Sequence, residues 1–172
     1  MQKQTRPLSE CIADYVSAVS AGDFARAYRG ILSALMQFKS AWEAVHPEDT
    51  VGALYQGYMD MSFVAVLPAA LAEWRLKISL VFLHETSLFT LWLTAGNRAI
   101  QKRVSDALKH VPLGKYSLCT LEPGVDAIIA LDLPKPYRFD EPEQLTKDLL
   151  QAAEVFLSDM TALVGSITQE NA

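Results

Sequence analysis

The sequence has little cysteine and no long apolar run. Its two cysteines, Cys11 and Cys119, are too few and too widely spaced for a disulfide framework or a zinc knuckle, so we expect both to be reduced. No uncharged run exceeds twelve residues, whereas a membrane-spanning helix needs about 20 apolar residues. Lys3 and Arg6 are followed by no apolar stretch, so no signal peptide is expected. The sequence therefore predicts a cytoplasmic protein with no membrane partner.

An excess of positive charge is also lacking. The chain has 15 Lys and Arg against 20 Asp and Glu, which argues against a nucleic-acid partner because such proteins present a basic face. Apolar residues make up 51% of the 172 residues, enough to form a core without a metal or disulfide. We predict one domain spanning 1–172, with mobile ends at 1–8 and 168–172.

Two amphipathic helices are predicted at the N-terminus. Apolar residues recur at helical spacing over 9–21, where Gly22 ends the pattern, and again from Asp23 to His46, where Pro47 cannot continue a helix. The very short joint between them predicts an antiparallel helical hairpin.

Five later segments have the apolar pattern and the flanking turn residues of strands. Residues 84–87 and 122–124 should each form the turn of a hairpin, and the short link 69–75 excludes a parallel crossover. The five predicted strands are 58–67, 77–84, 88–94, 116–121 and 125–133.

Two further helices complete the pattern. One follows Gly96-Asn97 and ends near Val111, and a long one starts near Asp140, which forms a capping box with Glu143, and runs to Ile167. The fold class predicted is α+β: a mainly antiparallel sheet of about five strands, packed with an N-terminal helical hairpin, a middle helix and a long C-terminal helix.

A candidate pocket is predicted around the first three strands. They bring phenols, carboxylates, an imidazole and an indole into one region, and such groups give a pocket both contact area and direction. Each residue also has a structural explanation: a covered sheet edge, a backbone turn, a hairpin end or a helix cap. The candidates are Tyr55, Tyr58, Asp60, His84, Glu85, Trp92 and Asn97.

Specific catalytic and metal-binding patterns do not emerge. Asp60 and the strand-borne Lys77 would suit a metal-dependent nuclease, but Arg75 stands where that chemistry needs a second carboxylate. His46 and His110 are not at metal-ligand spacing. We therefore predict no metal and no cofactor, assign no catalytic residue, and leave enzyme status open.

The chain resembles a family of uncharacterised bacterial proteins known as a domain of unknown function. The resemblance rests on the run Tyr55-Gln56-Gly57-Tyr58-Met59-Asp60-Met61, on the Phe82-x-His84-Glu85 hairpin, on Phe89-x-x-Trp92-Leu93 and on Asn97. It implies a free-standing bacterial protein whose polar residues in these motifs belong together, and it implies no particular activity.

Two functions follow as hypotheses. The first is a small-molecule-binding or enzymatic pocket, in which Asp60 beside His84 would raise the pKa of that imidazole. The alternative is an interaction or self-association module without catalysis, a homodimer formed by the C-terminal helix. That alternative requires the apolar stripe from Leu145 to Ile167 to be partly exposed.

Overall fold

The computed structural model describes residues 6–122 and 124–170, and side chains as far as 167. Its helices are α1 (Leu8–Ser20), α2 (Asp23–Val45), α3 (Arg98–Leu108) and α4 (Pro142–Glu170), with a 3-10 turn at Ala69–Leu71. Its strands are β1 (Thr50–Val51), β2 (Met61–Leu67), β3 (Leu76–Leu83), β4 (Leu88–Ala95) and β5 (Ala127–Asp132). The predicted α+β class is confirmed. The predicted mobile ends fall partly outside the described residues; within them, α1 begins at Leu8 and α4 continues to Glu170.

The five strands form one antiparallel meander in the order β1-β2-β3-β4-β5. The longest pairing joins β3 to β4, from Leu76 opposite Ala95 to Leu83 opposite Leu88. The predicted hairpin at 84–87 connects these two strands, so it sits at the centre of the sheet. Because every strand pairs with its neighbour in sequence, the sheet needs only short connections.

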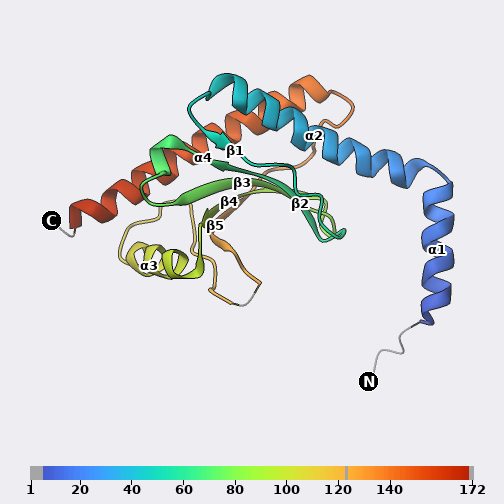
Figure 1. Cartoon of the computed structure of the whole chain (residues 1–172), viewed down its shortest axis with the longest axis horizontal. Helices are drawn as coiled ribbons and strands as arrows, with labels where there is room; N and C mark the ends of the chain where they lie inside the picture. Colours follow the sequence, from blue (N-terminus) through green and yellow to red (C-terminus); the bar gives the residue numbers. More distant parts are fainter. Residues whose placement is uncertain (1–5, 123, 171–172) are drawn as a thin grey trace.

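Helices α2 and α4 cover one face of the sheet, while α3 lies on the other side at one end (Figure 1). Alternate residues of the strands point toward α2 and α4 because successive side chains on a strand face opposite ways. The buried set on this face includes Val64, Leu80, Phe82, Leu91 and Leu93 from the strands, and Phe38, Trp42 and Phe156 from the helices. None of the described helices covers the rest of the opposite face (Figure 1).

The predicted helical hairpin is wrong in its geometry. Both helices form at the predicted positions, but α1 turns away from α2 and projects from the body (Figure 1). Gly22, with φ of +88°, makes this turn possible because only glycine adopts left-handed φ without strain. The buried residues of α2 begin at Ala34, so the part of α2 next to α1 has no core for α1 to join.

The second predicted hairpin forms only in part. Residues 116–121 are not a strand: a single bridge pairs Leu118 with Ile129, and Tyr116 instead packs its ring against Phe156 of α4. Pro123, in the turn predicted there, lies outside the described residues. The sheet also contains the two-residue strand β1. It was not predicted, because two residues are too few to show an alternating pattern.

The apolar stripe of α4 is buried, contrary to the exposure that the alternative function required. Leu145, Leu149, Phe156, Met160 and Ile167 are all almost inaccessible, because α4 packs against both the sheet and α2. The long helix is therefore used by the core. None of the described helices is long and apolar enough to cross a membrane.

Candidate functional site

The structure separates the seven predicted site residues. Trp92 and Asn97 lie in the wall of a cavity on the uncovered face of the sheet. The other five lie near the end of the sheet where β2 begins and β3 ends, and they take different roles there.

Asp60 forms a turn just before β2. Its carboxylate accepts a hydrogen bond from the backbone N–H of Tyr58 at 3.0 Å, and the N–H groups of Met61 and Tyr58 lower the pKa of Asp60. The Tyr58 side chain is 91% exposed. This is the backbone turn that we considered as the structural explanation of Asp60.

His84 holds the end of β3 to the segment before β2. Its backbone N–H donates to the Asp60 carbonyl at 3.0 Å, and its ring Nε2 lies 2.9 Å from the Ser62 hydroxyl. The Ser62 hydroxyl donates to the Gln56 carbonyl at 2.6 Å, so the ring nitrogen must be the donor in the Ser62–His84 bond. Because the imidazole N–H donates a hydrogen bond to Ser62 instead of accepting one from its hydroxyl, the ring is not placed as a general base that would activate the serine as a nucleophile.

The predicted rise in the pKa of His84 is wrong. Burial lowers the pKa of His84, and the nearby Asp60 carboxylate opposes that shift only in part. The two residues are therefore close in space. Their backbone hydrogen bond links the end of β3 to the segment before β2.

Glu85 is exposed in the β3–β4 turn, whereas Tyr55 packs against a residue of the cavity wall. The Tyr55 ring lies 4.8 Å from the ring of Phe63, with the two backbones joined by an isolated bridge. Phe63 in turn lines the cavity, so Tyr55 supports its wall from outside.

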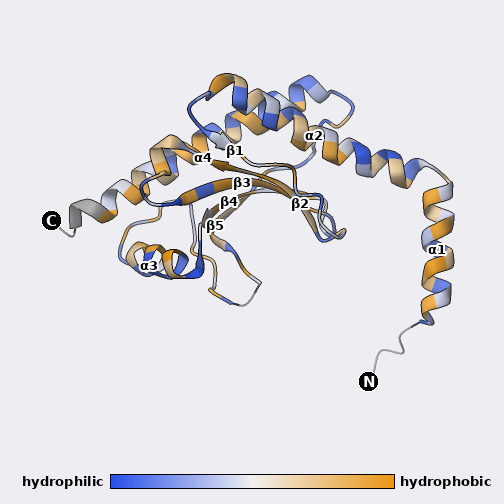
Figure 2. Cartoon of the chain, in the orientation of Figure 1, coloured by the Kyte–Doolittle hydropathy of each residue, from blue (hydrophilic) through white to orange (hydrophobic). Residues whose placement is uncertain are grey.

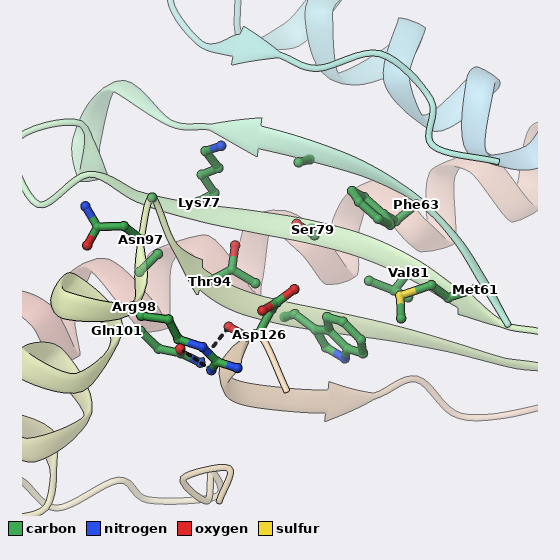
Figure 3. Close-up of a pocket in the computed structure, with 14 residues that line it drawn as sticks. Met61, Phe63, Lys77, Ser79, Val81, Thr94, Asn97, Arg98, Gln101 and Asp126 are labelled. Atoms are coloured by element: carbon green, nitrogen blue, oxygen red, sulfur yellow. Dashed lines mark hydrogen bonds between the residues drawn. The ribbon is translucent and has the colours of Figure 1, made fainter. Parts of the chain in front are cut away.

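The cavity has a volume of about 360 Å³ and lies on the face of β2, β3 and β4 that α2 and α4 leave open. Its apolar lining comes from Met61, Phe63, Ala65, Val81, Trp92, Ala95 and Gly96, and its polar lining from Lys77, Ser79, Thr94, Asn97, Arg98, Gln101 and Asp126. Lys77 and Asn97 lie toward one end, and Met61, Phe63 and Val81 toward the other (Figure 3). The cavity is therefore amphipathic along its length.

Several polar groups of the cavity have no partner. Among the described residues, Lys77 forms no ion pair and no side-chain hydrogen bond, and the Ser79 hydroxyl has none although the residue is only 4% exposed. Asn97 caps α3 through Oδ1, which accepts from the Ile100 N–H at 2.9 Å, and this leaves its amide N–H groups unused. No buried side-chain nitrogen or oxygen of the described residues lacks a hydrogen-bond partner, so these unpaired groups are open to the cavity and can bind water or a ligand.

Arg98 and Gln101 fix the wall that faces this polar end. The Arg98 guanidinium donates to the carbonyls of Val125 and Glu122 at 2.6 and 2.9 Å. The buried Gln101 amide donates to the carbonyls of Val125 and Asp126 at 3.1 and 3.0 Å. Helix α3 thus holds the loop that carries Asp126 into the cavity wall.

Sequence reasoning missed most of the polar lining. The sequence pattern connects Lys77 only with a nuclease site, and it does not identify Ser79, Thr94 or Asp126 as site residues. The alternation of β3 could have found Lys77 and Ser79, because both lie on the face opposite the apolar Ile78 and Leu80. Asp126 belongs to a loop, and no periodicity would have placed it. Over the part of the chain that the structure describes, no group of three or more His, Cys, Asp or Glu could hold a metal ion.

These features define an α+β protein with an antiparallel sheet that is helix-covered on one face and hollowed on the other. The chain belongs to the family described as Domain of unknown function (DUF7000), whose model matches residues 8–164. The resemblance to a domain of unknown function is thereby confirmed. Comparison with curated proteins and with solved structures gives no match.

Proposed function

We propose that this protein binds a small organic anion with a flat apolar body in the cavity on the uncovered face of its sheet. The observation that carries the proposal is the unpaired Lys77 ammonium, with the unpaired Ser79 hydroxyl two residues further along the same strand, in a cavity whose other end is apolar. An anionic group would satisfy both polar groups, while the apolar part of the ligand covers Phe63 and Trp92.

The size and charge of the cavity narrow the ligand class. A volume of about 360 Å³ is at the small end of the range for ligand pockets, which favours a compact molecule. Lys77 and Arg98 contribute two positive charges to the lining and Asp126 one negative charge, so a ligand with a single negative charge suits the balance. The polar lining consists of hydroxyls, amides and single charges, and we assign no chemical step to it.

Two cysteines that form no disulfide, Cys11 and Cys119, support a cytoplasmic setting for this binding. The alternative, an interaction module acting through α4, is less favoured. It requires an exposed apolar stripe on that helix, and the stripe is buried.

The proposal is tested with three probes of one shape and different charge: 2-naphthoate, 2-naphthamide and 2-naphthylmethylamine. In ligand-observed NMR we expect 2-naphthoate to bind best. Lys77→Met should weaken naphthoate binding by about 3- to 10-fold, as expected for loss of one charge-assisted contact. Lys102→Met is the matched control, because Lys102 pairs with Asp106 on the outer side of α3. Equal binding of all three probes, or equal effects of the two variants, would contradict the proposal.

A further inference from the structure

Asp126 contributes to the cavity wall a carboxylate that has no partner among the described residues. Its side chain is exposed and forms neither an ion pair nor a hydrogen bond there. The guanidinium of Arg98, which lines the same cavity, is already bonded to the side-chain oxygen of Gln101 and to the carbonyls of Val125 and Glu122. The Asp126 carboxylate is therefore free to accept a hydrogen bond from a molecule in the cavity.

The backbone is fixed on both sides of this carboxylate. The side-chain amide of Gln101, a residue only 3% exposed, donates to the carbonyls of Val125 and Asp126 at 3.1 and 3.0 Å. Directly after Asp126, Ala127 pairs with Thr94 of β4, and the β4–β5 register shifts next to this pair. Such irregularities are over-represented beside functional sites, where they re-aim a side chain. A carboxylate on a backbone held in place beforehand needs little further ordering when a ligand binds.

Trp92 offers an aromatic surface in the same cavity. It lies on β4 opposite Ser79 of β3 and Ala130 of β5, and both neighbours have small side chains. Its indole contacts no other aromatic ring among the described residues. A flat molecule can therefore lie against the indole and present its edge to the polar groups of the wall.

The polar groups are set apart along the cavity. Figure 3 shows Lys77 and Asn97 toward one end, Met61 toward the other, and Asp126 between them. Figure 2 shows hydrophilic residues at the start of α3, at one end of the sheet, and mainly hydrophobic residues along the strands. A ligand whose anionic group binds Lys77 therefore passes Asp126 as its body extends toward the apolar end.

We propose that the ligand is an aromatic acid with a neutral N–H or O–H donor on its ring, and that Asp126 selects it by accepting that hydrogen bond. The inference rests on the proposed function, because it places the anionic group of the ligand at Lys77. Charge favours a neutral donor over a cationic one. Lys77, Arg98 and Asp126 together leave the lining with one excess positive charge, which a singly charged acid balances and a zwitterion does not.

The test compares indole-4-carboxylate, indole-5-carboxylate and indole-6-carboxylate with their N-methyl analogues, which lack the donor. Calorimetry on the intact chain gives the dissociation constants. For at least one isomer we expect the N–H acid to bind about 3- to 10-fold more tightly than the N-methyl acid, as for one charge-assisted hydrogen bond. In Asp126→Ala this ratio should fall to about one, because the acceptor is gone. Glu85→Ala is the matched control: it removes an exposed carboxylate outside the cavity and should keep the ratio.

2-Naphthoate separates this inference from the proposed function, because it carries an acid and no donor. Lys77→Met should weaken its binding and Asp126→Ala should not. Circular dichroism of Asp126→Ala should match that of the unsubstituted chain, since the side chain is exposed and unpaired among the described residues.

The possible outcomes are distinct. If 2-naphthoate binds through Lys77 while every N–H acid binds like its N-methyl analogue, the role of Asp126 is overturned and the proposed function stands. A preference for the N–H acid that survives Asp126→Ala would equally overturn that role. If neither 2-naphthoate nor any indole acid binds, both proposals are contradicted.

Discussion

At the residue scale, one carbonyl organises the segment that precedes β2. The Gln56 carbonyl accepts hydrogen bonds from the Ser62 hydroxyl at 2.6 Å and from the Tyr28 hydroxyl at 3.2 Å, and His84 donates to Ser62. The sequence singled out His84 for its chemistry. Its neighbours in space assign it a structural role, which only the folded chain reveals because Tyr28 and Ser62 lie far from it in sequence.

The titration of His84 follows from this environment. Burial lowers the pKa of His84 below its usual value while Asp60 partly opposes the shift, so Asp60→Asn should lower the pKa further. Because the folded chain binds fewer protons than the unfolded chain, the contribution of His84 to stability is complete above about pH 6.5 and is lost as the pH falls from there through the lower pKa of the folded state. NMR titration of the ring signals in both proteins measures this. A pKa above about 6.5, or one unchanged by Asp60→Asn, would contradict the arrangement.

Gly57 is the residue whose replacement should do most harm to this segment. It has φ of +70°, and a Cβ atom there would lie 1.8 Å from the Met61 carbonyl oxygen. Gly57→Ala should therefore lower the free energy of unfolding by at least about 2 kcal/mol, from strain and clash together. Gly22→Ala is the matched control, since Gly22 has φ of +88° but open space around it, and should cost only about 1 kcal/mol. Equal costs in urea unfolding would show that the clash relaxes freely.

At the element scale, the elements with strong periodicity were predicted and those fixed by distant contacts were not. Helix α2 and the β3–β4 hairpin form where expected because their apolar residues repeat over many positions. Residues 116–121 have the composition of a strand but not its structure, because Tyr116 is held by α4 through a 2.6 Å hydrogen bond to Asp159. Local pattern cannot report such a contact.

The central hairpin can be tested by removing one of its buried rings. Phe82 is packed against Phe89 across the hairpin with ring centroids 4.9 Å apart, and it is almost fully buried. Phe82→Ala should cost about 3–5 kcal/mol, from lost apolar burial and the cavity left behind. Val155→Ala, at an exposed position of α4, should stay within about 0.5 kcal/mol. An unfolding midpoint unchanged by Phe82→Ala would show that the faces of the hairpin are assigned wrongly.

At the scale of the whole molecule, the two faces of the sheet have different roles. One face is used for stability, since α2 and α4 bury it together with the stripe of α4. The other carries a cavity with unpaired polar groups, and beyond both lies α1, which projects from the body and has no buried residue (Figure 1). The α+β class and four of the five strands followed from the sequence, and two of the predicted site residues, Trp92 and Asn97, line the cavity. The uncovered face of the sheet could not be predicted, because the sequence shows which residues are apolar but not which surfaces remain uncovered.

The most direct test of ligand binding at this free face is the indole N–H signals of the tryptophans during a titration with 2-naphthoate. Trp92 lines the cavity, whereas Trp42 is buried on the helix-covered face with its indole N–H bonded to Asp49 at 2.9 Å. If the cavity binds the anion, the Trp92 signal shifts and saturates while the Trp42 signal stays in place. A Trp92 signal that does not move at millimolar naphthoate, or that moves only together with Trp42, would contradict binding in the cavity.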